Sequence, residues 1–350
     1  MPWFARKLTA PMKPLILSSP EPRSLEIIFT DSARERLFEK YRLVEVGQNE
    51  VAALPDSVLA EVRYVLGQPP IPAELLARMG SLRAVLNVES NLLPNMPYDL
   101  LFQRGIYTLT TGAVFAEPVA EIGLAFALSL LRDVVEGDQA FQAGRELWGF
   151  EGNQRARLLT GAKVGLIGFG DLGRAVNRVL EGFRVQVSAY DPWLPPSVLR
   201  DHRVTPAGLE EVLTGSDVVF CVASVTGENE GFLQARHFAM MRQGAAFILL
   251  SRAGVVDFDA LITAVGSGHI LAASDVYPQE PLPLDHPVRK LKGFLRSAHR
   301  AGALDVAMKR MGDMVLEDMD LMDRGLTPLR CKRAERETAA KMRSKPVDKT

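Results

Sequence analysis

A glycine pattern between a predicted strand and a predicted helix constrains this chain more than any other feature. Residues 164–173 read VGLIGFGDLG, so Gly168, Gly170 and Gly173 have the spacing G-x-G-x-x-G directly after an apolar run. The first glycine permits a tight turn, the second lets the backbone approach a pyrophosphate, and the third lets the helix pack closely on the strand. The helix N-terminus then offers N–H groups to the phosphates. The pattern predicts a parallel α/β domain that binds a dinucleotide.

An acidic residue closes the next predicted strand, VQVSAYD, at Asp191, and no basic residue follows it in Pro192, Trp193 or Leu194. A carboxylate at this place accepts hydrogen bonds from an adenosine ribose and repels a 2′-phosphate, so we expect NAD as the cofactor rather than NADP. The alternative is a glycine-rich turn and a solvated Asp. The residues expected to bind the dinucleotide here are Gly168, Gly170, Asp171, Leu172, Gly173 and Asp191.

Apolar runs alternate with amphipathic stretches along most of the chain, which is typical of parallel sheets covered by helices. The predicted strands are 15–17, 43–46, 62–66, 84–88, 106–109, 164–167, 185–190, 218–223, 246–250 and 270–276. Two long helices are expected, one from about Glu117 to Ala143 and one from about Ala301 to Asp323. Because 350 residues exceed what one hydrophobic core usually supports, we expect two domains.

Composition excludes several classes of protein. With 41 Lys and Arg against 42 Asp and Glu, the net charge of -1 gives no electrostatic case for a nucleic-acid partner. Cys221 and Cys331 cannot form a disulfide framework, which fits a reducing compartment. The N-terminus lacks the apolar core of a signal peptide, and no apolar run approaches the roughly 20 residues of a membrane span. We expect a cytoplasmic protein with no membrane partner and no bound metal.

Three polar residues follow predicted strands or lie in loops, where α/β sheets build their sites. Arg252 lies in LLSRAGVVD, Glu280 in the proline-rich SDVYPQEPLPLDHP, and His299 in SAHRAGAL before the last long helix. Taken singly, each has an ordinary explanation: a surface Arg, a loop Glu and a helix-capping His. Their order and their sequence contexts together favour a catalytic set.

The chain resembles the D-isomer-specific 2-hydroxyacid dehydrogenases, the family that includes D-lactate, glycerate and 3-phosphoglycerate dehydrogenases. The resemblance covers nearly the whole chain and is strongest from Arg104 to Ala303. The matching stretches are RGIYTLTTG, PVAEIGLAFALSLLR, Trp148, VGLIGFGDLG, Asp191, VTGENEGF, MRQGAAFILLSRAGVVD, SDVYPQEPLPLDHP and SAHRAG.

The resemblance implies two doubly wound parallel-sheet domains, a flavodoxin-like substrate domain with an inserted Rossmann NAD-binding domain. The substrate domain would comprise 14–116 and 302–330, the NAD-binding domain 117–301, and 331–350 would form a basic and flexible tail. The resemblance also implies a homodimer, with the apolar helix near Ile122 to Leu131 as a natural contact. The chain resembles the phosphoglycerate and glycerate dehydrogenases of the family, and the departures described below indicate a divergent branch.

The family's Arg, Glu and His fall on Arg252, Glu280 and His299. By resemblance His299 would be the acid/base, Glu280 its partner, and Arg252 the group that binds the substrate carboxylate and carbonyl, a task that suits a planar, permanently charged fork. Relatives that oxidise formate carry Gln where this chain has Glu280, so a D-2-hydroxyacid or 2-ketoacid substrate is expected. The further residues that would line the cofactor are Leu250, Ser251, Arg252, Asp275, His299 and Gly302.

The chain departs from its family in the predicted substrate loop. Many relatives bind the substrate carboxylate with a glycine-rich loop, but here the stretch is NVESNLLPN, with Glu89, Ser90 and Asn91 in place of glycines. An inward Glu89 would repel an anionic substrate, whereas Ser90 and Asn91 would donate hydrogen bonds. The alternative places Glu89 outward or at a helix cap. A second reading of the whole chain is an NAD(H)-sensing binding protein of the co-repressor type with little turnover.

Overall fold

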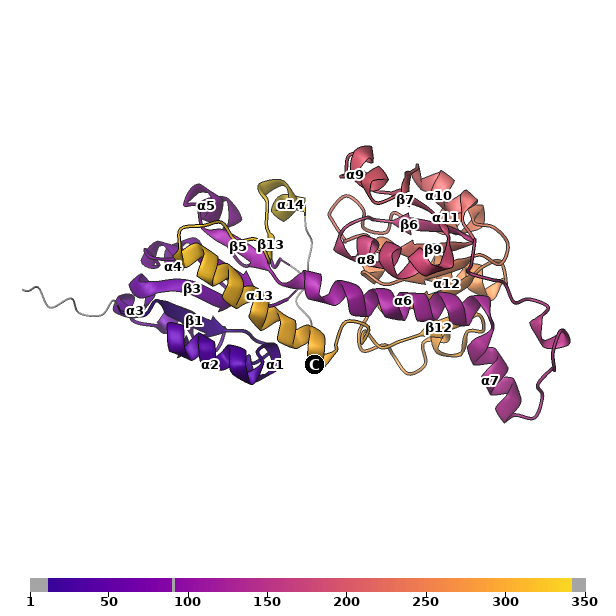
Figure 1. Cartoon of the computed structure of the whole chain (residues 1–350), viewed down its shortest axis with the longest axis horizontal. Coiled ribbons are helices and arrows are strands. Elements are labelled where there is room, and N and C mark those ends of the chain that lie inside the picture. Colours follow the sequence, from indigo (N-terminus) through magenta and orange to yellow (C-terminus); the bar gives the residue numbers. More distant parts are fainter. Residues whose placement is uncertain (1–11, 90–91, 342–350) are drawn as a thin grey trace, which may run out of the picture. The chain divides into compact units, whose positions relative to one another are not determined.

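The computed structural model describes residues 12–89 and 92–341, and this part of the chain divides into two units. Unit 2 comprises Phe115–Ala307, and unit 1 comprises the described residues before it together with Met308–Ala340. Each unit is built on a parallel sheet covered by helices (Figure 1). The predicted fold class, two doubly wound α/β domains, is therefore confirmed.

Sheet A of unit 1 has the strand order β13-β5-β4-β3-β1-β2, and its first five strands in the chain pair in parallel. The strands are β1 (Leu15–Ser19), β2 (Arg42–Glu45), β3 (Val62–Gly67), β4 (Ala84–Asn87), β5 (Tyr107–Thr110) and β13 (Lys332–Arg333). The helices are α1 (Leu25–Ile28), α2 (Asp31–Lys40), α3 (Asp56–Glu61), α4 (Ala73–Arg78), α5 (Tyr98–Gln103), α13 (Asp305–Asp323) and α14 (Arg336–Lys341).

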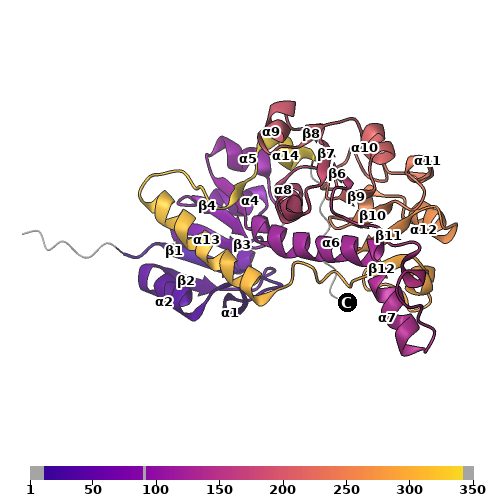
Figure 2. The ribbon, with the colours of Figure 1, turned by 45° about the vertical axis from the view of Figure 1, so that its right-hand side comes forward.

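Helix α13 lies across one face of sheet A in both views (Figures 1 and 2), and its last residue fixes it there. The carboxylate of Asp323 accepts hydrogen bonds from the hydroxyls of Tyr41 and Tyr64, both at 2.7 Å, and from Arg63 Nε at 2.9 Å. Burial and the neighbouring carboxylate raise the pKa of both phenols, so both remain hydrogen-bond donors. Helix α13 is thereby part of the core of unit 1.

Residues 331–341, for which a flexible tail was expected, include the short strand β13 and the helix α14. Asp318 is fully buried, and its carboxylate accepts the backbone N–H groups of Leu329, Arg330 and Cys331 at 2.7 to 2.9 Å. This turn directs β13 into antiparallel pairing with β5, followed by α14. Residues 342–350 of the predicted tail lie outside the described residues. The buried carboxylate of Asp318, rather than the charge of the tail, determines the structure of residues 329–331.

Sheet B of unit 2 has the strand order β12-β11-β10-β9-β6-β7-β8, with every pairing parallel. The strands are β6 (Lys163–Ile167), β7 (Gln186–Tyr190), β8 (Thr205–Pro206), β9 (Val218–Cys221), β10 (Ala246–Leu249), β11 (Leu271–Ser274) and β12 (Phe294–Arg296). The helices are α6 (Ala116–Leu131), α7 (Val134–Gln142), α8 (Asp171–Leu180), α9 (Pro196–Asp201), α10 (Leu209–Gly215), α11 (Ala235–Met240) and α12 (Phe258–Gly266).

Both faces of sheet B are buried, which explains why its central strands read as continuous apolar runs. Side chains alternate between the two faces along a strand. In β9, Val218 and Phe220 join the core under α6 and α8, whereas Val219 and Cys221 join the core under α10, α11 and α12. Because all seven strands are parallel, their carboxyl ends lie along one edge of the sheet, and Asp191, Arg252 and His299 follow strands at this edge.

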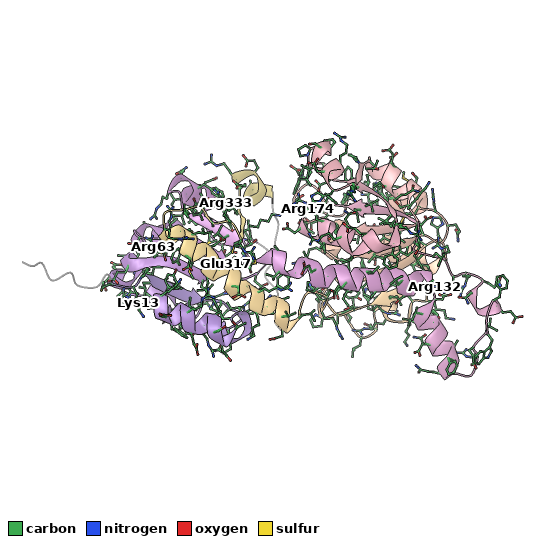
Figure 3. All side chains as sticks on the ribbon, in the orientation of Figure 1. Lys13, Arg63, Arg132, Arg174, Glu317 and Arg333 are labelled. Atoms are coloured by element: carbon green, nitrogen blue, oxygen red, sulfur yellow. The ribbon has the colours of Figure 1, made fainter. Side chains whose placement is uncertain are left out.

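The long helix expected from Glu117 to Ala143 is two helices. Asp133 adopts a left-handed conformation with φ of 54°, which ends α6 at Leu131 and starts α7 at Val134 in a new direction. Asp tolerates this conformation better than most residues, and hydrophobic periodicity does not report it. Figure 3 labels Arg132 at this junction.

The stretch Gly112–Leu131 is long and apolar enough to cross a membrane, contrary to the expectation from apolar runs. Half of it is buried inside the protein, as in the core helix of a globular domain. It packs against α8 and the strands of sheet B. The composition of α6 is accounted for by this core position.

Candidate active site

The glycine loop between β6 and α8 has the shape of a phosphate cradle. Gly168 has φ of +95°, and a Cβ there would lie 2.8 Å from the backbone of Ala223. A Cβ on Gly173 would lie 2.6 Å from the carbonyl oxygen of Gly168, whereas no other group lies within 4 Å of the Cβ position at Gly170. Gly168 and Gly173 thus pack directly against backbone, whereas the space beside Gly170, next to the helix N-terminus, is empty. These residues fit the pyrophosphate of a dinucleotide.

Asp191, at the carboxyl end of β7, is bonded to the glycine loop. Its Oδ2 accepts the N–H of Phe169 at 2.8 Å, and its Oδ1 accepts the N–H groups of Trp193 and Leu194 at 3.0 and 3.2 Å. The carboxylate is therefore fixed in one orientation beside the cradle. Ionised carboxylates have about four acceptor sites, so one remains for a ligand hydroxyl.

The three candidate catalytic residues follow three adjacent strands of sheet B. Arg252 follows β10, Glu280 lies in the loop after β11, and His299 follows β12. Because β12, β11 and β10 are neighbours in the sheet, their carboxyl ends bring the loops together. Arg252 and His299 are far apart in the sequence, but the neighbouring parallel strands bring their loops to the same edge of the sheet.

His299 and Glu280 form a direct hydrogen-bonded pair. Glu280 Oε2 lies 2.6 Å from His299 Nδ1, with side-chain exposures of 33% and 41%. The other carboxylate oxygen of Glu280 accepts the N–H of Tyr277 at 2.8 Å. The bond occupies Nδ1, so Nε2 is the ring nitrogen that could exchange a proton with another group.

The charge of Glu280 is maintained by its surroundings. Partial burial raises the pKa of this carboxyl, but hydrogen bonds from His299 and from the N–H of Tyr277, with the positive charges of His299 and Arg252, outweigh it. The pKa of Glu280 therefore lies below its ordinary value. Glu280 remains a carboxylate throughout the pH range in which an imidazole titrates.

Asp275 builds the turn that presents His299. It is 2% exposed, and its carboxylate oxygens each accept one backbone N–H, from Arg300 and Ala301, at 3.1 Å. Its carbonyl oxygen accepts the N–H of His299 at 2.8 Å. His299 has φ of 50°, a conformation that is unfavourable for a residue with a Cβ and needs such support. Asp275, which was expected to line the cofactor, thus holds the turn that carries His299.

The side chain of Arg252 folds back onto the backbone of the preceding residue. Its Nη1 donates to the carbonyl oxygen of Ser251 at 2.7 Å, and its charge acts on Glu280. Leu250 and Ser251 are buried beside it at 4% and 9% exposure. Gly302 lies under Phe115, whose ring would be 2.9 Å from a Cβ at that position. The buried positions of Leu250 and Ser251, and the close contact at Gly302, therefore leave little room for larger side chains.

The predicted substrate loop carries a contact that the sequence did not reveal. Glu89 Oε2 forms an ion pair with Arg23 Nη2 at 3.1 Å, so Glu89 is neither a bare inward charge nor a helix cap. Ser90 and Asn91 lie outside the described residues. Sequence reasoning also missed Tyr277, whose contribution is a backbone N–H. The available signal for Arg23 was a cation in the short loop that follows the first strand.

Comparisons with known proteins identify the family of this chain. The family model described as D-isomer specific 2-hydroxyacid dehydrogenase, NAD binding domain, matches residues 124–301. A glyoxylate reductase of Korarchaeum cryptofilum is 30% identical over 263 residues, which are 74% of this chain and 78% of that protein. The chain belongs to the D-isomer-specific 2-hydroxyacid dehydrogenase family.

Two further relatives of this D-2-hydroxyacid dehydrogenase extend the comparison. A crystal structure of a phosphoglycerate oxidoreductase from Rhizobium etli is 66% identical, with a TM-score of 0.87, and covers 93% of this chain and all of that one. A D-3-phosphoglycerate dehydrogenase of Archaeoglobus fulgidus is 27% identical over 81% of this chain and 53% of that protein. The resemblance seen in the sequence is confirmed. The protein is an NAD-dependent 2-hydroxyacid dehydrogenase, and its cofactor is a nicotinamide dinucleotide.

Proposed function

We propose that the enzyme interconverts a short D-2-hydroxyacid and its 2-ketoacid, with His299, Glu280 and Arg252 as its catalytic residues. The observation that carries this proposal is the 2.6 Å bond between Glu280 and His299 Nδ1 at the carboxyl edge that also holds the glycine loop. A histidine held by a carboxylate on one nitrogen is equipped to exchange a proton through the other.

Each residue has a distinct task in reduction of the ketoacid. When bound, the dinucleotide supplies the hydride that adds to the carbonyl carbon. Nε2 of the protonated His299 gives its proton to the carbonyl oxygen, and Glu280 stabilises the imidazolium before the transfer. Arg252 binds the carboxylate of the substrate and polarises its carbonyl group, because its planar fork matches a carboxylate in two hydrogen bonds. In the oxidative direction His299 takes the proton of the hydroxyl group.

The cofactor would be held by the residues that shape the cradle and the strand ends. Backbone N–H groups of the first turn of α8 would bind the pyrophosphate. Asp191 would accept a ribose hydroxyl at its remaining acceptor site. The remaining positions proposed for this task are Gly168, Gly170, Asp171, Leu172, Gly173, Leu250, Ser251, Arg252, Asp275, His299 and Gly302.

The substrate class follows from the relatives and from Glu280. Relatives are named as acting on glyoxylate and phosphoglycerate, which are small organic acids. Steady-state turnover of glyoxylate, pyruvate, hydroxypyruvate and 3-phosphohydroxypyruvate with NADH tests the proposal. We expect oxidation of NADH with at least one of them. Tight NADH binding without turnover of any 2-ketoacid would favour a sensing role instead.

Replacing Glu280 with glutamine should move the pH profile of ketoacid reduction toward acid. Reduction needs the protonated imidazole, and loss of the adjacent negative charge makes that form less stable. The pH at which kcat falls to half should therefore decrease by about 1 unit, the lower end of the effect of an opposite charge because the pair is partly exposed. The measurement is kcat against pH for both proteins. Glu210→Gln on α10 is the matched control, and its midpoint should equal that of the wild type. A midpoint of E280Q equal to that of the wild type would show that Glu280 does not stabilise the protonated imidazole.

We also propose a homodimer, with the segment from α7 to residue 158 as its main contact. In Figures 1 and 2 α7 leads away from the sheet of its own unit, and the segment exposes apolar side chains. Trp148 and Phe150 are 74% and 83% exposed. Apolar surface of this kind marks a protein interface. The Ile122 to Leu131 helix, by contrast, is already half covered by its own unit.

Sedimentation equilibrium should give twice the mass of the chain at micromolar concentration. Aspartates at both Trp148 and Phe150 should give the monomer mass, because a charge at each position would be desolvated in the contact. The paired change of Leu326 and Leu329, which are exposed in unit 1, is the control. A wild-type monomer, or a dimeric W148D/F150D variant, contradicts this contact.

We infer a cytoplasmic location for this dimer. Cys221 and Cys331 are buried free thiols rather than a disulfide. Burial raises the pKa of both thiols, so they remain protonated and unreactive. Such cysteine use fits a reducing compartment.

A further inference from the structure

A buried hydrogen-bond donor without a partner lies beside the glycine loop of unit 2. Arg174 belongs to helix α8, which begins directly after the loop, and its side chain is partly buried (Figure 3 labels this residue). Its Nε is buried, yet within the part of the chain that the structure describes this nitrogen has no hydrogen-bond partner. A buried donor that stays unpaired costs stability, and the cost is larger when the donor is charged. A bound ligand that accepts this hydrogen bond would offset the cost.

Arg174 lies one helical turn above Gly170, the residue where α8 is capped. Its backbone N–H donates to the carbonyl oxygen of Gly170 at 3.0 Å. Residues i and i+4 share one face of a helix, and each Cα–Cβ bond is tilted toward the helix N-terminus. The side chain of Arg174 therefore starts toward the first turn of α8, where the space at the Cβ position of Gly170 is empty. The unpaired donor and the empty space belong to the same face of the helix.

The charges around the glycine loop call for a cation. Asp171 is the first residue of α8, and the carboxylate of Asp191 accepts the N–H of Phe169 at 2.8 Å. A pyrophosphate bound here would bring further negative charge, against which the helix N-terminus offers only about half a positive charge. Among residues 164–177, Arg174 is the only lysine or arginine. Its guanidinium is therefore the positive charge that the loop and the first turns of α8 supply.

We propose that Arg174 binds the pyrophosphate of the dinucleotide, and that its Nε–H is kept unpaired in the free protein for this ligand. A planar guanidinium suits the task because it donates two parallel hydrogen bonds to phosphate oxygens. The inference rests on the proposed function, in which backbone N–H groups of α8 bind the phosphates, and it adds one charged side chain to them. Arg174 is then a cofactor-binding residue that takes no part in the proton transfer.

Binding of two fragments of the cofactor to Arg174→Met tests the proposal by isothermal titration. Methionine keeps an unbranched apolar stem and removes every donor of the guanidinium. ADP-ribose contains the pyrophosphate, so its Kd should rise by about tenfold, the lower end of the effect of a hydrogen bond between charged groups. Adenosine contains no phosphate, so its Kd should stay within about twofold of the wild-type value. Arg174→Lys keeps the charge without the fork and should raise the Kd of ADP-ribose by about threefold.

The melting temperature without ligand separates a binding role from a structural one. Removal of an unpaired buried donor removes a cost, so R174M should melt at the wild-type temperature or above it. Saturating ADP-ribose should then raise the melting temperature of R174M less than that of the wild type. An R174M protein that binds ADP-ribose as tightly as the wild type overturns the proposal. A lower melting temperature combined with equal losses of affinity for ADP-ribose and adenosine also overturns it, because Arg174 would then be structural.

Two further variants of the same segment serve as controls. Arg178→Met changes an exposed arginine one turn further along α8 and should leave both Kd values unchanged. Gly170→Val fills the empty space at the cap without meeting another group, so it should remove ADP-ribose binding from a folded protein. Failure of the proposed function would look different: the wild type would bind no ADP-ribose, or G170V would bind it equally well. Either result would also overturn the role of Arg174.

Discussion

Replacement of His299 by alanine should lower kcat for ketoacid reduction by a factor of about 100 to 10,000, the usual contribution of a positioned acid–base group. Alanine lacks the nitrogen that gives the proton, and it leaves Glu280 without its partner at 2.6 Å. The glycine loop and Asp191 are untouched, so the Kd of NADH should change little. Single-turnover kinetics and NADH fluorescence titration measure the two quantities.

Two details make this prediction specific to the side chain. The backbone at His299 has φ of 50°, so asparagine, which tolerates this conformation, is a second variant that separates loss of the ring from loss of the turn. His269→Ala is the matched control, because His269 precedes β11 at the end of the sheet opposite to Asp275. If His299→Ala kept more than about a tenth of wild-type kcat, the proton would have to come from another group.

Much of this fold could be predicted because local pattern and tertiary position agree. Val218 to Cys221 and Ala246 to Leu249 are continuous apolar runs since helices cover both faces of the sheet. The break at Asp133 could not be predicted, because one left-handed residue leaves hydrophobic periodicity intact on both sides. Nor could the order of residues 331–334, which depends on a buried Asp318 that reads as an ordinary helical acid in the sequence.

The same distinction applies to the site. Arg252, Glu280 and His299 could be found from sequence because all three lie in stretches that resemble the family, and because Arg252 and Glu280 follow predicted strands. The strand β12 before His299 was not predicted. The support of that site could not be found in this way. Asp275 acts through two backbone N–H groups of a turn, and Arg23 meets Glu89 only because β1 and β4 lie in one sheet. Such contacts depend on the register of distant segments.

The enzyme should bind NADH at least about thirtyfold more tightly than NADPH, since an unpaired charge clash in a partly enclosed site costs about 2 kcal/mol or more. The clash would arise between Asp191 and a 2′-phosphate. Three backbone N–H groups hold the Asp191 carboxylate in place, so it cannot turn away from the phosphate. Residues 191–195 contain no lysine or arginine that would offset the charge. Isothermal titration of the wild type with both cofactors measures the ratio.

Asp191→Asn isolates the charge from the shape of the site. Asparagine retains one oxygen for the N–H groups of Trp193 and Leu194, but its amide nitrogen would face the N–H of Phe169. NADH should therefore bind somewhat more weakly, while the preference over NADPH should fall to about threefold because the repulsion is gone. Asp201→Asn, at the end of α9, changes the net charge equally and should leave the ratio unaltered. Equal affinities in the wild type, or the same ratio in D191N, would mean that Asp191 organises the glycine loop without choosing the cofactor.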